Sequence, residues 1–259
     1  MRRVAVVGSG LIGTSVALAA RRAWPEATIA TFDRGDSLEA AAGADVIVLA
    51  TPVNVIIDIL TREGRRFGEA LVLDTGSTKR AILTIARSTG LANFVGGHPM
   101  AGAASSGSRE ARSDLFDGRP WFLVPLDPLS PALAPASEFV TALGATPVVM
   151  TDDGAAHDRV MAAVSQLPQV VASVLMKVAG EAVGNDGLGW AGAGLRDTTR
   201  LASSSSSMWE SLLATNADEL RPLLLTFANE IGELAGHLDK PDAVRRLFTT
   251  ATQYRDRLR

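Results

Sequence analysis

Val4-Ala5-Val6-Val7-Gly8-Ser9-Gly10-Leu11-Ile12-Gly13 is the stretch that decides the fold of this chain. Its apolar start predicts a buried strand, and the apolar spacing that continues through Ala17 and Ala20 predicts a helix. Between them, the first glycine would make a tight turn, the second would let the backbone approach a pyrophosphate, and the third would let helix and strand pack closely. Glycine-rich turns also form for structural reasons alone, so the pattern predicts a dinucleotide site only in a suitable context.

Asp33 supplies this context, because it ends the second apolar run 20 residues after Gly13. An acid at this position would hydrogen-bond the adenosine ribose hydroxyls and repel a 2′-phosphate, while the pyrophosphate lies at the positive end of the helix. Arg34 is either a solvated surface residue or a group that accepts such a phosphate. We therefore expect NAD as the cofactor, with NADP as the alternative that Arg34 leaves open.

Short β-branched apolar runs alternate with helical patterns through the first part of the chain. The runs cover residues 4–7, 28–32, 45–50, 71–74, 94–96, 121–125 and 147–150. They are typical of strands buried on both faces of a mostly parallel sheet, which predicts a doubly wound α/β domain of the Rossmann type. Only about a dozen residues separate Asp33 from Asp45, too few for the usual helix and third strand, so we expect a sheet trimmed around strand 3 and an open adenine side.

The pattern changes near Met150, after which only helical segments are expected. They run from about 153 to 183, from 209 to 238 and from 241 to 258. We therefore expect a dinucleotide-binding domain over residues 1–150 and an all-helical substrate and dimerisation domain over residues 151–259. Long apolar helices in roughly 110 residues would be marginal as a lone bundle, so we expect a second copy to bury them in a homodimer.

The composition is that of an ordinary soluble globular protein, with 47% apolar residues, 20% charged residues and a formal net charge of -3. No basic run indicates nucleic-acid binding, and no stretch approaches the roughly 20 apolar residues of a membrane span. The absence of cysteine excludes disulfides, thiolate metal sites and cysteine nucleophiles. Met1-Arg2-Arg3 leads directly into the first strand without the pattern of a signal peptide, so a cytoplasmic location is expected.

The segment Gly96-Gly97-His98-Pro99-Met100-Ala101-Gly102 places one of three histidines on a glycine-lined turn after an apolar run. Histidine readily moves a proton near neutral pH, so His98 is a candidate catalytic acid or base. The alternative is a turn histidine that is hydrogen-bonded to a neighbouring carbonyl.

Two polar turns, Thr51-Pro52-Val53 and Gly76-Ser77-Thr78, follow the strands expected at 45–50 and 71–74. Both would lie at the carboxyl ends of strands, where open α/β sheets bind their ligands. Ordinary strand-to-helix turns, with Ser77 or Thr78 as the N-cap, are the alternative, and a residue can serve both roles.

Together these motifs resemble the TyrA family of prephenate and arogenate dehydrogenases, which make the tyrosine precursor 4-hydroxyphenylpyruvate or tyrosine itself. The glycine fingerprint is shared with many dehydrogenases, whereas the GHPMAG turn combined with the RDTTR cassette is much more specific. The matching pieces occur in the family's order over nearly the whole chain: Gly8-Ser9-Gly10-Leu11-Ile12-Gly13, Ala50-Thr51-Pro52-Val53, Asp74-Thr75-Gly76-Ser77-Thr78-Lys79, Gly97-His98-Pro99-Met100-Ala101-Gly102, His157-Asp158-Arg159, and Gly194-Leu195-Arg196-Asp197-Thr198-Thr199-Arg200 before Met208-Trp209.

The resemblance implies that His98 accepts the proton of the substrate's ring hydroxyl while hydride leaves the same carbon for the nicotinamide. Loss of CO2 aromatises the ring, and no metal is needed. Ser77 is implied to hydrogen-bond that hydroxyl and His98, and Arg200 to hold a substrate carboxylate by a bidentate pair. Asp197 and Trp209 match residues that shape the same pocket, with a contribution across the dimer interface left open.

Several of these residues also have plain structural interpretations. Arg200 on its own would be a solvated or helix-capping arginine, and Trp209 a core residue. His157 and His237 lie in helical segments without a partner pattern and are interpreted as structural. The residues implied to contact the cofactor are Gly8, Ser9, Gly10, Leu11, Ile12, Gly13, Asp33, Arg34, Thr51, Pro52, Val53 and Ser77.

The chain departs from the family at three places. Many members carry Ser-His-Leu-Pro-His where this chain has Ser165-Gln166-Leu167-Pro168-Gln169, so the second histidine, which contacts the substrate side chain, is Gln169 here. A neutral amide suits an ammonium-bearing tail better than a histidine does, which favours arogenate at least as much as prephenate. Ala103-Ala104 stands where many members have an acid that regulates access to the arginine. The trimmed nucleotide fold is the third departure, and it would loosen the choice between NAD and NADP.

Two other functions are considered. Enzymes of the β-hydroxyacid dehydrogenase and imine reductase type also join a Rossmann domain to a helical dimerisation domain, but hydroxyacid enzymes generally use a helical-domain lysine, and Lys177 has no polar partner pattern. A non-catalytic NAD-binding regulator would account for the lost histidines and the trimmed fold. Such a regulator has no need for Ser77, His98 and Arg200 together.

Overall fold

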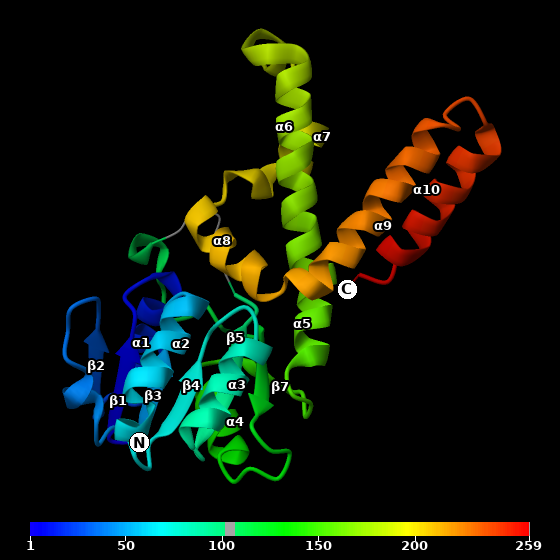
Figure 1. Ribbon diagram of the computed structural model, residues 1–259. Coiled ribbons are helices and arrows are strands. Elements are labelled where there is room, and N and C mark those ends of the chain that lie inside the picture. Colours follow the sequence, from blue (N-terminus) through cyan, green and yellow to red (C-terminus); the bar gives the residue numbers. More distant parts are fainter. Residues whose placement is uncertain (102–106, 259) are drawn as a thin grey trace.

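The computed structural model describes residues 1–101 and 107–258, which form a sheet-based lobe and a helical lobe (Figure 1). The chain passes from the first lobe to the second just before α5, and α6 rises away from the sheet as a long helix. The departure at Ala103-Ala104 lies outside the described residues.

A seven-stranded sheet forms the first lobe, with the strand order β2-β1-β3-β4-β5-β6-β7. Neighbouring strands are parallel except for β5 and β6, which are antiparallel. The prediction of a mostly parallel sheet of the Rossmann type is confirmed. The strands are β1 (Arg3–Val7), β2 (Thr28–Phe32), β3 (Val46–Leu49), β4 (Leu71–Asp74), β5 (Phe94–Pro99), β6 (Pro120–Pro125) and β7 (Thr146–Val149).

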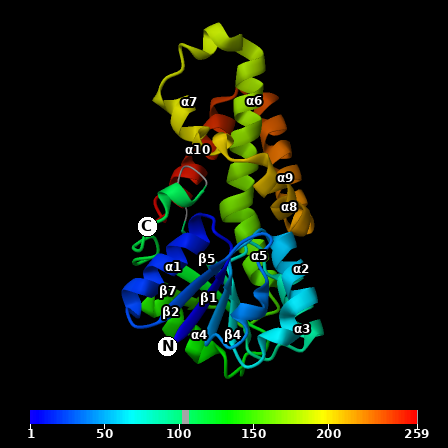
Figure 2. The same ribbon diagram turned by 90° about the vertical axis from the view of Figure 1, so that its left-hand side faces the viewer.

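Helices cover both faces of this sheet, which explains why its inner strands are continuous apolar runs (Figure 2). Along β1, Val4 and Val6 pack into the core on one face, and Ala5 and Val7 pack into the core on the other. The first core lies under α1 (Leu11–Ala23) and α4 (Leu133–Ala142), and the second under α2 (Val53–Glu63) and α3 (Arg80–Thr89).

The sheet ends at β2, because the connection to β3 is too short for another helix and strand. It forms only η1 (Leu38–Ala41), a short 3-10 helix whose first turn is capped by the Ser37 hydroxyl, which accepts from the Glu39 amide at 3.3 Å. The expected trimming around strand 3 is therefore confirmed. As a result, β2 is the edge strand of the sheet, and η1 alone connects it to β3.

The second lobe is entirely helical in its described residues. Its elements are α5 (Ala155–Met161), the π turn η4 (Ala162–Gln166), α6 (Leu167–Leu188), α7 (Ala193–Thr198), η5 (Arg200–Ser203), α8 (Ser206–Thr215), α9 (Ala217–Ala235) and α10 (Pro241–Arg255). The remaining short 3-10 helices of the sheet lobe are η2 (Gly64–Phe67) and η3 (Ser108–Glu110).

The prediction of a single helix over residues 209–238 is wrong, because the helix is interrupted at Asn216, between α8 and α9. The buried amide of Asn216 donates to the backbone oxygen of Asp158 at 2.8 Å and to Oε1 of Gln166 at 3.0 Å. These bonds tie the break to the π turn η4, where the regular helical ladder is interrupted. The break thus depends on a tertiary contact that helical periodicity does not reveal.

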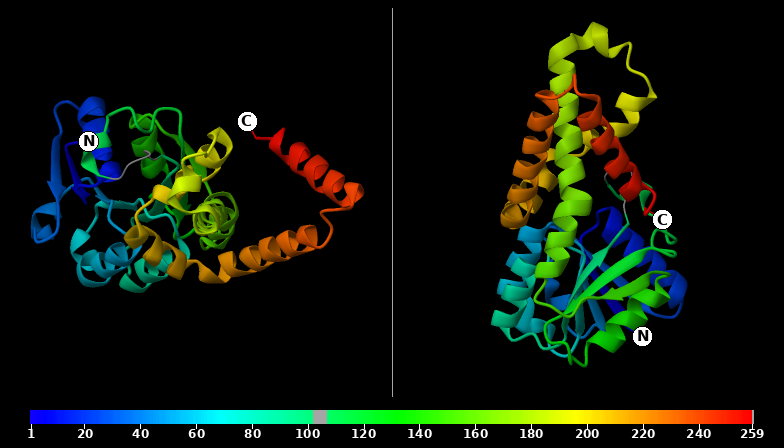
Figure 3. Two further views of the ribbon diagram at one scale, coloured as in Figure 1. Left: turned by 90° about the horizontal axis from the view of Figure 1, so that it is seen from above. Right: turned by 90° about the vertical axis from the view of Figure 1, so that its right-hand side faces the viewer.

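Large apolar side chains are exposed along α6, α9 and α10. The helical run Ala155–Leu188 is long and apolar enough to cross a membrane by length and composition alone, which corrects the expectation that no stretch approaches such a span. In Figure 3, α9 and α10 project away from α6 and from the sheet. Exposed apolar surface of this kind indicates contact with another molecule. The exposed side chains include Val174, Val178, Val183, Leu225, Ile231 and Phe248.

Replacement of Gly97 by alanine is expected to lower the free energy of unfolding by about 1–3 kcal/mol, because a Cβ there would lie 2.3 Å from the backbone oxygen of Asp74. The matched control is Gly194→Ala on α7, where nothing described lies within 4 Å of the new Cβ and helix propensity favours alanine. Urea unfolding at one protein concentration measures both. Equal stabilities of the two variants would contradict the close approach of β4 and β5.

Candidate active site

The glycine turn between β1 and α1 has the contacts that its spacing predicts. Gly8 has a φ of +112°, and a Cβ there would lie 2.3 Å from the backbone oxygen of Ala50. A Cβ on Gly13 would lie 2.0 Å from the backbone oxygen of Gly8, so helix and strand pack too closely for a side chain. In contrast, no described atom lies within 4 Å of the Cβ position of Gly10, which leaves that side of the turn open.

The N-terminus of α1 offers backbone amides to a ligand. Gly10 provides no side-chain cap, and the first turn, which begins with Leu11 and Ile12, contains no acidic residue. Uncapped amides at the positive end of a helix form a favourable site for a phosphate group. The residues present therefore fit a pyrophosphate.

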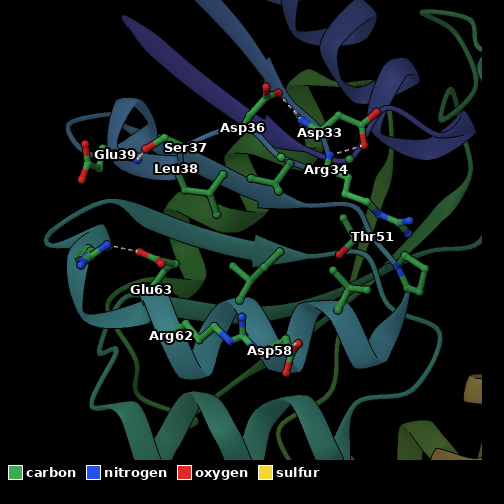
Figure 4. A pocket seen from close by; sticks show the side chains of 17 residues that line it. Asp33, Arg34, Asp36, Ser37, Leu38, Glu39, Thr51, Asp58, Arg62 and Glu63 are labelled. Carbon is green, nitrogen blue, oxygen red and sulfur yellow. Dashed lines mark hydrogen bonds and ion pairs between the residues drawn. The ribbon is translucent and has the colours of Figure 1, made fainter.

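A cavity of about 490 Å³ continues from this turn toward η1, and its size suits a nucleotide (Figure 4). Asp33 lies in its wall and accepts hydrogen bonds from the Ser9 hydroxyl and from the Arg34 amide at 2.7 Å. These two bonds, the hydroxyl first, hold the pKa of Asp33 below its ordinary value. Oγ1 of Thr51, a residue of the same wall, is buried without a partner among residues 1–101 and 107–258, so it is free to bond a ligand.

His98 lies in β5 and is 9% exposed, so the prediction that it sits on a turn is wrong. The two glycines before it are extended and pair with β6, where His98 is opposite Phe122. The strands β1, β3, β4 and β5 run parallel, so their carboxyl ends meet at one edge of the sheet. This edge brings together the glycine turn, Thr51, Ser77 and His98.

A buried ion pair between Lys79 and Asp74 lies beneath this edge. Lys79 Nζ also donates to the backbone oxygen of Gly97 at 2.7 Å. The Asp74 carboxylate accepts from the amide of Gly97 at 3.0 Å and from the amide of Gly76 at 2.8 Å. The pair therefore fixes the backbone directly before His98 and directly before Ser77.

His157 has two hydrogen-bond partners that the sequence interpretation missed, so the expectation that it lacks a partner is wrong. Its Nε2 lies 2.9 Å from Nδ1 of His98, and its Nδ1 lies 2.8 Å from Oδ1 of Asp158. Both rings are buried and meet edge to face, with centroids 5.1 Å apart. The adjacent His157-Asp158 pair was the available signal, but nothing in the sequence alone places this pair against β5.

Asp158 also caps α3, so the N-cap expected from Ser77 or Thr78 is wrong. Its carboxylate accepts from the backbone amides of Lys79 at 2.6 Å and Arg80 at 3.0 Å. Burial acts to raise the pKa of Asp158, but the hydrogen bonds from His157 and from these two amides outweigh it and the pKa is lowered. Asp158 is therefore an ionised acceptor that joins α5, α3 and the histidine pair.

The chain of hydrogen bonds fixes the tautomer of each ring. The Asp158 carboxylate requires a proton on Nδ1 of His157, which leaves Nε2 of His157 as an acceptor for Nδ1–H of His98. Nε2 of His98 then keeps its lone pair. Burial, followed by the nearby His157 and Lys79, holds the pKa of His98 well below its ordinary value. His98 is thus neutral at neutral pH and able to accept a proton at Nε2.

The other predicted site residues are less closely connected. Ser77 is half-buried on the turn after β4, Arg200 is exposed at the start of η5, and Asp197 is exposed on α7. Within the described ranges, no hydrogen bond or ion pair joins these three residues to His98. Trp209 on α8 is partly buried, and its Nε1 has no partner among the described residues. The proposed roles of these residues therefore stay predictions.

Gln169 holds the segment that carries Arg200. Its amide nitrogen donates to the backbone oxygen of Leu201 at 2.8 Å, and its amide oxygen accepts from the Ser204 hydroxyl at 3.3 Å. The side chain is 6% exposed. Gln169 thus acts on η5 within the chain, in addition to any contact with a ligand.

Two family models match consecutive parts of the chain. The model described as "Prephenate dehydrogenase, nucleotide-binding domain" matches residues 12–151, and the model described as "Prephenate dehydrogenase, dimerization domain" matches residues 153–250. A curated prephenate dehydrogenase of Lactococcus lactis is 30% identical to this chain over an alignment of 281 residues, gaps included. The alignment covers 98% of this chain and 77% of the relative.

Solved structures share the same architecture. The arogenate dehydrogenase of Synechocystis is 27% identical, with a TM-score of 0.80 over 98% of this chain and 99% of that chain. The prephenate dehydrogenase of Aquifex aeolicus, solved in complex with hydroxyphenyl propionate and NAD+, has a TM-score of 0.87 and 23% identity over 99% of this chain and 98% of that chain. The second likeness concerns the fold alone.

The lowered pKa of His98 predicts how stability depends on pH. A histidine in the unfolded chain has a pKa of about 6.5, whereas the pKa of His98 in the folded protein is lower. At pH values between these two pKa values the unfolded chain binds more protons than the folded one. The free energy of unfolding therefore falls as the pH decreases. His98→Asn should remove up to about 1.4 kcal/mol per pH unit from this slope. Urea unfolding from pH 7.5 down to pH 5 measures it, with the half-buried His237 replaced in His237→Asn as the control. Parallel slopes for wild type and His98→Asn would refute the assignment.

Proposed function

The chain belongs to the prephenate dehydrogenase family, and from this premise we propose how its residues carry out the oxidation. The protein is an NAD-dependent oxidoreductase of the prephenate and arogenate dehydrogenase type, which acts in tyrosine biosynthesis. The family resemblance predicted from the motifs is thereby confirmed. One observation carries the mechanism: a single edge of the sheet holds both the dinucleotide turn and His98, whose Nε2 is free to accept a proton.

His98 accepts the proton of the substrate's ring hydroxyl at Nε2. NAD, when bound, accepts the hydride that leaves the carbon bearing this hydroxyl. Departure of the ring carboxylate as CO2 supplies the electrons that make the ring aromatic, so a positioned base and cofactor suffice. Ser77, which the turn at Gly76 positions at the same edge, hydrogen-bonds the hydroxyl and orients it toward His98.

The cofactor is held by the first lobe, which we assign to residues 1–150. The turn residues Gly8 to Gly13 hold the pyrophosphate at the N-terminus of α1, and Thr51, Pro52 and Val53 lie at the neighbouring strand end. Asp33 and Asp36 both line the cavity and place two carboxylates on its adenosine side. They lie close together, since the Asp36 carboxylate accepts a hydrogen bond from the Asp33 amide at 2.7 Å. A 2′-phosphate would meet this negative charge, which supports NAD over NADP in spite of Arg34.

The substrate is held by the helical lobe, which we assign to residues 151–259. Arg200 pairs with a substrate carboxylate, and Asp197 and Trp209 shape the pocket around it. The neutral amide of Gln169 favours the ammonium-bearing tail of arogenate at least as much as the pyruvyl tail of prephenate. The hydroxyacid dehydrogenase alternative is not favoured, because Lys177 is exposed and pairs with Glu181 at 2.8 Å.

Two copies of the chain associate through the helical lobe. The exposed apolar side chains of α6, α9 and α10 support this homodimer, as does the dimerization-domain model that matches residues 153–250. In this homodimer the partner, and not a membrane, buries the apolar side chains of the helical run over residues 155–188. We place the enzyme in the cytoplasm, as the sequence predicts.

NADH formation with NAD and either prephenate or arogenate tests the function. Wild type should turn over at least one substrate, and His98→Asn should lower kcat by about 10²- to 10⁴-fold, because the proton acceptor is lost. The control is His237→Asn, which changes a histidine whose ring is bonded only to the backbone oxygen of Glu233 among the described residues. NAD binding without turnover of either substrate by wild type would contradict an enzymatic role and favour the regulator.

Substrate preference is expected to depend on Gln169. The ratio of kcat/KM for arogenate to that for prephenate should be about one or greater in wild type, and it should fall by several-fold in Gln169→His, since an imidazolium attracts the pyruvyl carboxylate. The comparison is made at pH 6 and pH 8, because only the protonated ring carries charge. An unchanged ratio at both pH values would show that Gln169 acts only on η5.

A further inference from the structure

We propose that His157 is a positioning residue that also receives the proton from His98, so that the positive charge produced by the oxidation rests between His157 and Asp158 rather than on His98. This inference depends on the proposed function, since it concerns the fate of the proton that His98 accepts. It assigns a role to a residue that would otherwise only complete a buried hydrogen bond.

The geometry permits the transfer without movement of either ring. The 2.9 Å contact between Nδ1 of His98 and Nε2 of His157 is a normal hydrogen-bond length, and the 2.8 Å contact between Nδ1 of His157 and Asp158 continues the line. Phe122 stands against both rings, with centroids 6.4 Å from His98 and 5.5 Å from His157. The three ring systems therefore support one another in fixed orientations.

The charges around the two rings differ in sign. His98 lies close to the Lys79 ammonium, although Asp74 offsets that charge. His157 instead contacts the Asp158 carboxylate directly. A second proton on an imidazole is stabilised by an adjacent anion and destabilised by burial near a cation, so His157 is the better resting place for the charge.

The outer groups do not reverse this preference. Arg80 of α3 lies 3.4 Å from Asp158, but it also forms two 2.7 Å bonds with the Asp218 carboxylate of α9. Arg159, the next residue on α5, pairs with Glu219 at 3.5 Å. Each cation near the histidine pair thus has its own carboxylate, and Asp158 remains an anion in contact with His157.

Every proton in this relay is accounted for. The substrate O–H bond breaks as an N–H bond forms at Nε2 of His98, while the N–H bond at Nδ1 of His98 breaks and a new one forms at Nε2 of His157. His98 is left neutral with its proton on the opposite nitrogen, and His157 becomes an imidazolium that donates to Asp158. The electron pair of the C–H bond leaves as hydride to NAD. The electron pair released with CO2 leaves the ring oxygen of the product as a phenolate. Both proton transfers then reverse, and Nε2–H of His98 returns the proton to that oxygen, so the product departs as a phenol and both histidines regain their starting tautomers.

A proton inventory tests the proposal, because it counts the protons in flight. Single-turnover rates of hydride transfer are measured in mixtures of H2O and D2O, first for wild type. Two moving protons predict a curved dependence of the rate on the deuterium fraction, whereas one moving proton predicts a straight line. A straight line for wild type would overturn the relay, whatever the variants do.

His157→Gln then separates transfer from positioning. The glutamine oxygen can still accept from Nδ1–H of His98, but the amide cannot take up the proton. We expect a single-turnover rate about 10²-fold lower, the lower end of what a positioned base contributes, and a straight proton inventory. If the variant folds and keeps the curved proton inventory, His157 has only a structural role, whatever the single-turnover rate of the variant.

His237→Gln is the matched control and should keep the rate and the curvature of wild type. Failure of the proposed function has a different signature, since wild type itself would then bind NAD without forming NADH from either substrate. An active wild type with a straight inventory leaves the dehydrogenase assignment intact and removes only the relay.

Discussion

The carboxylate of Asp158 is the constraint on which the site depends. It accepts from two backbone amides at the start of α3, from Nδ1 of His157, and from the guanidinium of Arg80. Hydrogen bonds to a charged group contribute about 1.5–3 kcal/mol each when they are buried, which is enough to offset removing this anion from water. Because α3 belongs to the sheet lobe and α5 to the helical lobe, one side chain fixes the junction of the lobes and the orientation of the histidine pair.

The second buried ion pair, between Asp74 and Lys79, has a related effect on the opposite side of His98. Its hydrogen bonds end on the backbone of Gly76 and Gly97, so the turn that carries Ser77 and the strand that carries His98 are held by one pair of charges. A buried ion pair contributes little net stability, but removal of one partner is costly because the other charge is left unpaired. We attribute to this pair a positional role, since it holds the backbone beside Ser77 and His98, two predicted site residues on separate elements.

Much of the fold could be predicted from the sequence because its signals are local. Continuous apolar runs located the seven strands of the described residues to within three residues at each end, and the short spacer between Asp33 and Asp45 correctly indicated a trimmed sheet. The cap of α3 was misassigned because only nearby residues were considered, whereas the actual cap comes from Asp158, 79 residues beyond Lys79. His157 was missed for the same reason, as its partner lies 59 residues earlier on β5. Tertiary contacts of this kind leave no periodicity in the sequence.

The break at Asn216 ties these long-range contacts to the start of α9. Asn216 holds the backbone of Asp158 through its amide nitrogen and accepts from Arg80 through its amide oxygen at 3.2 Å, and α9 begins at the next residue. The Arg80 guanidinium also donates two hydrogen bonds to the carboxylate of Asp218 in the first turn of α9. The direction in which α9 leaves the lobe is therefore set by the same bonds that hold Asp158 against His157. Because α9 also carries exposed apolar side chains, the helix that offers this surface begins at the same hydrogen bonds that hold Asp158 against His157.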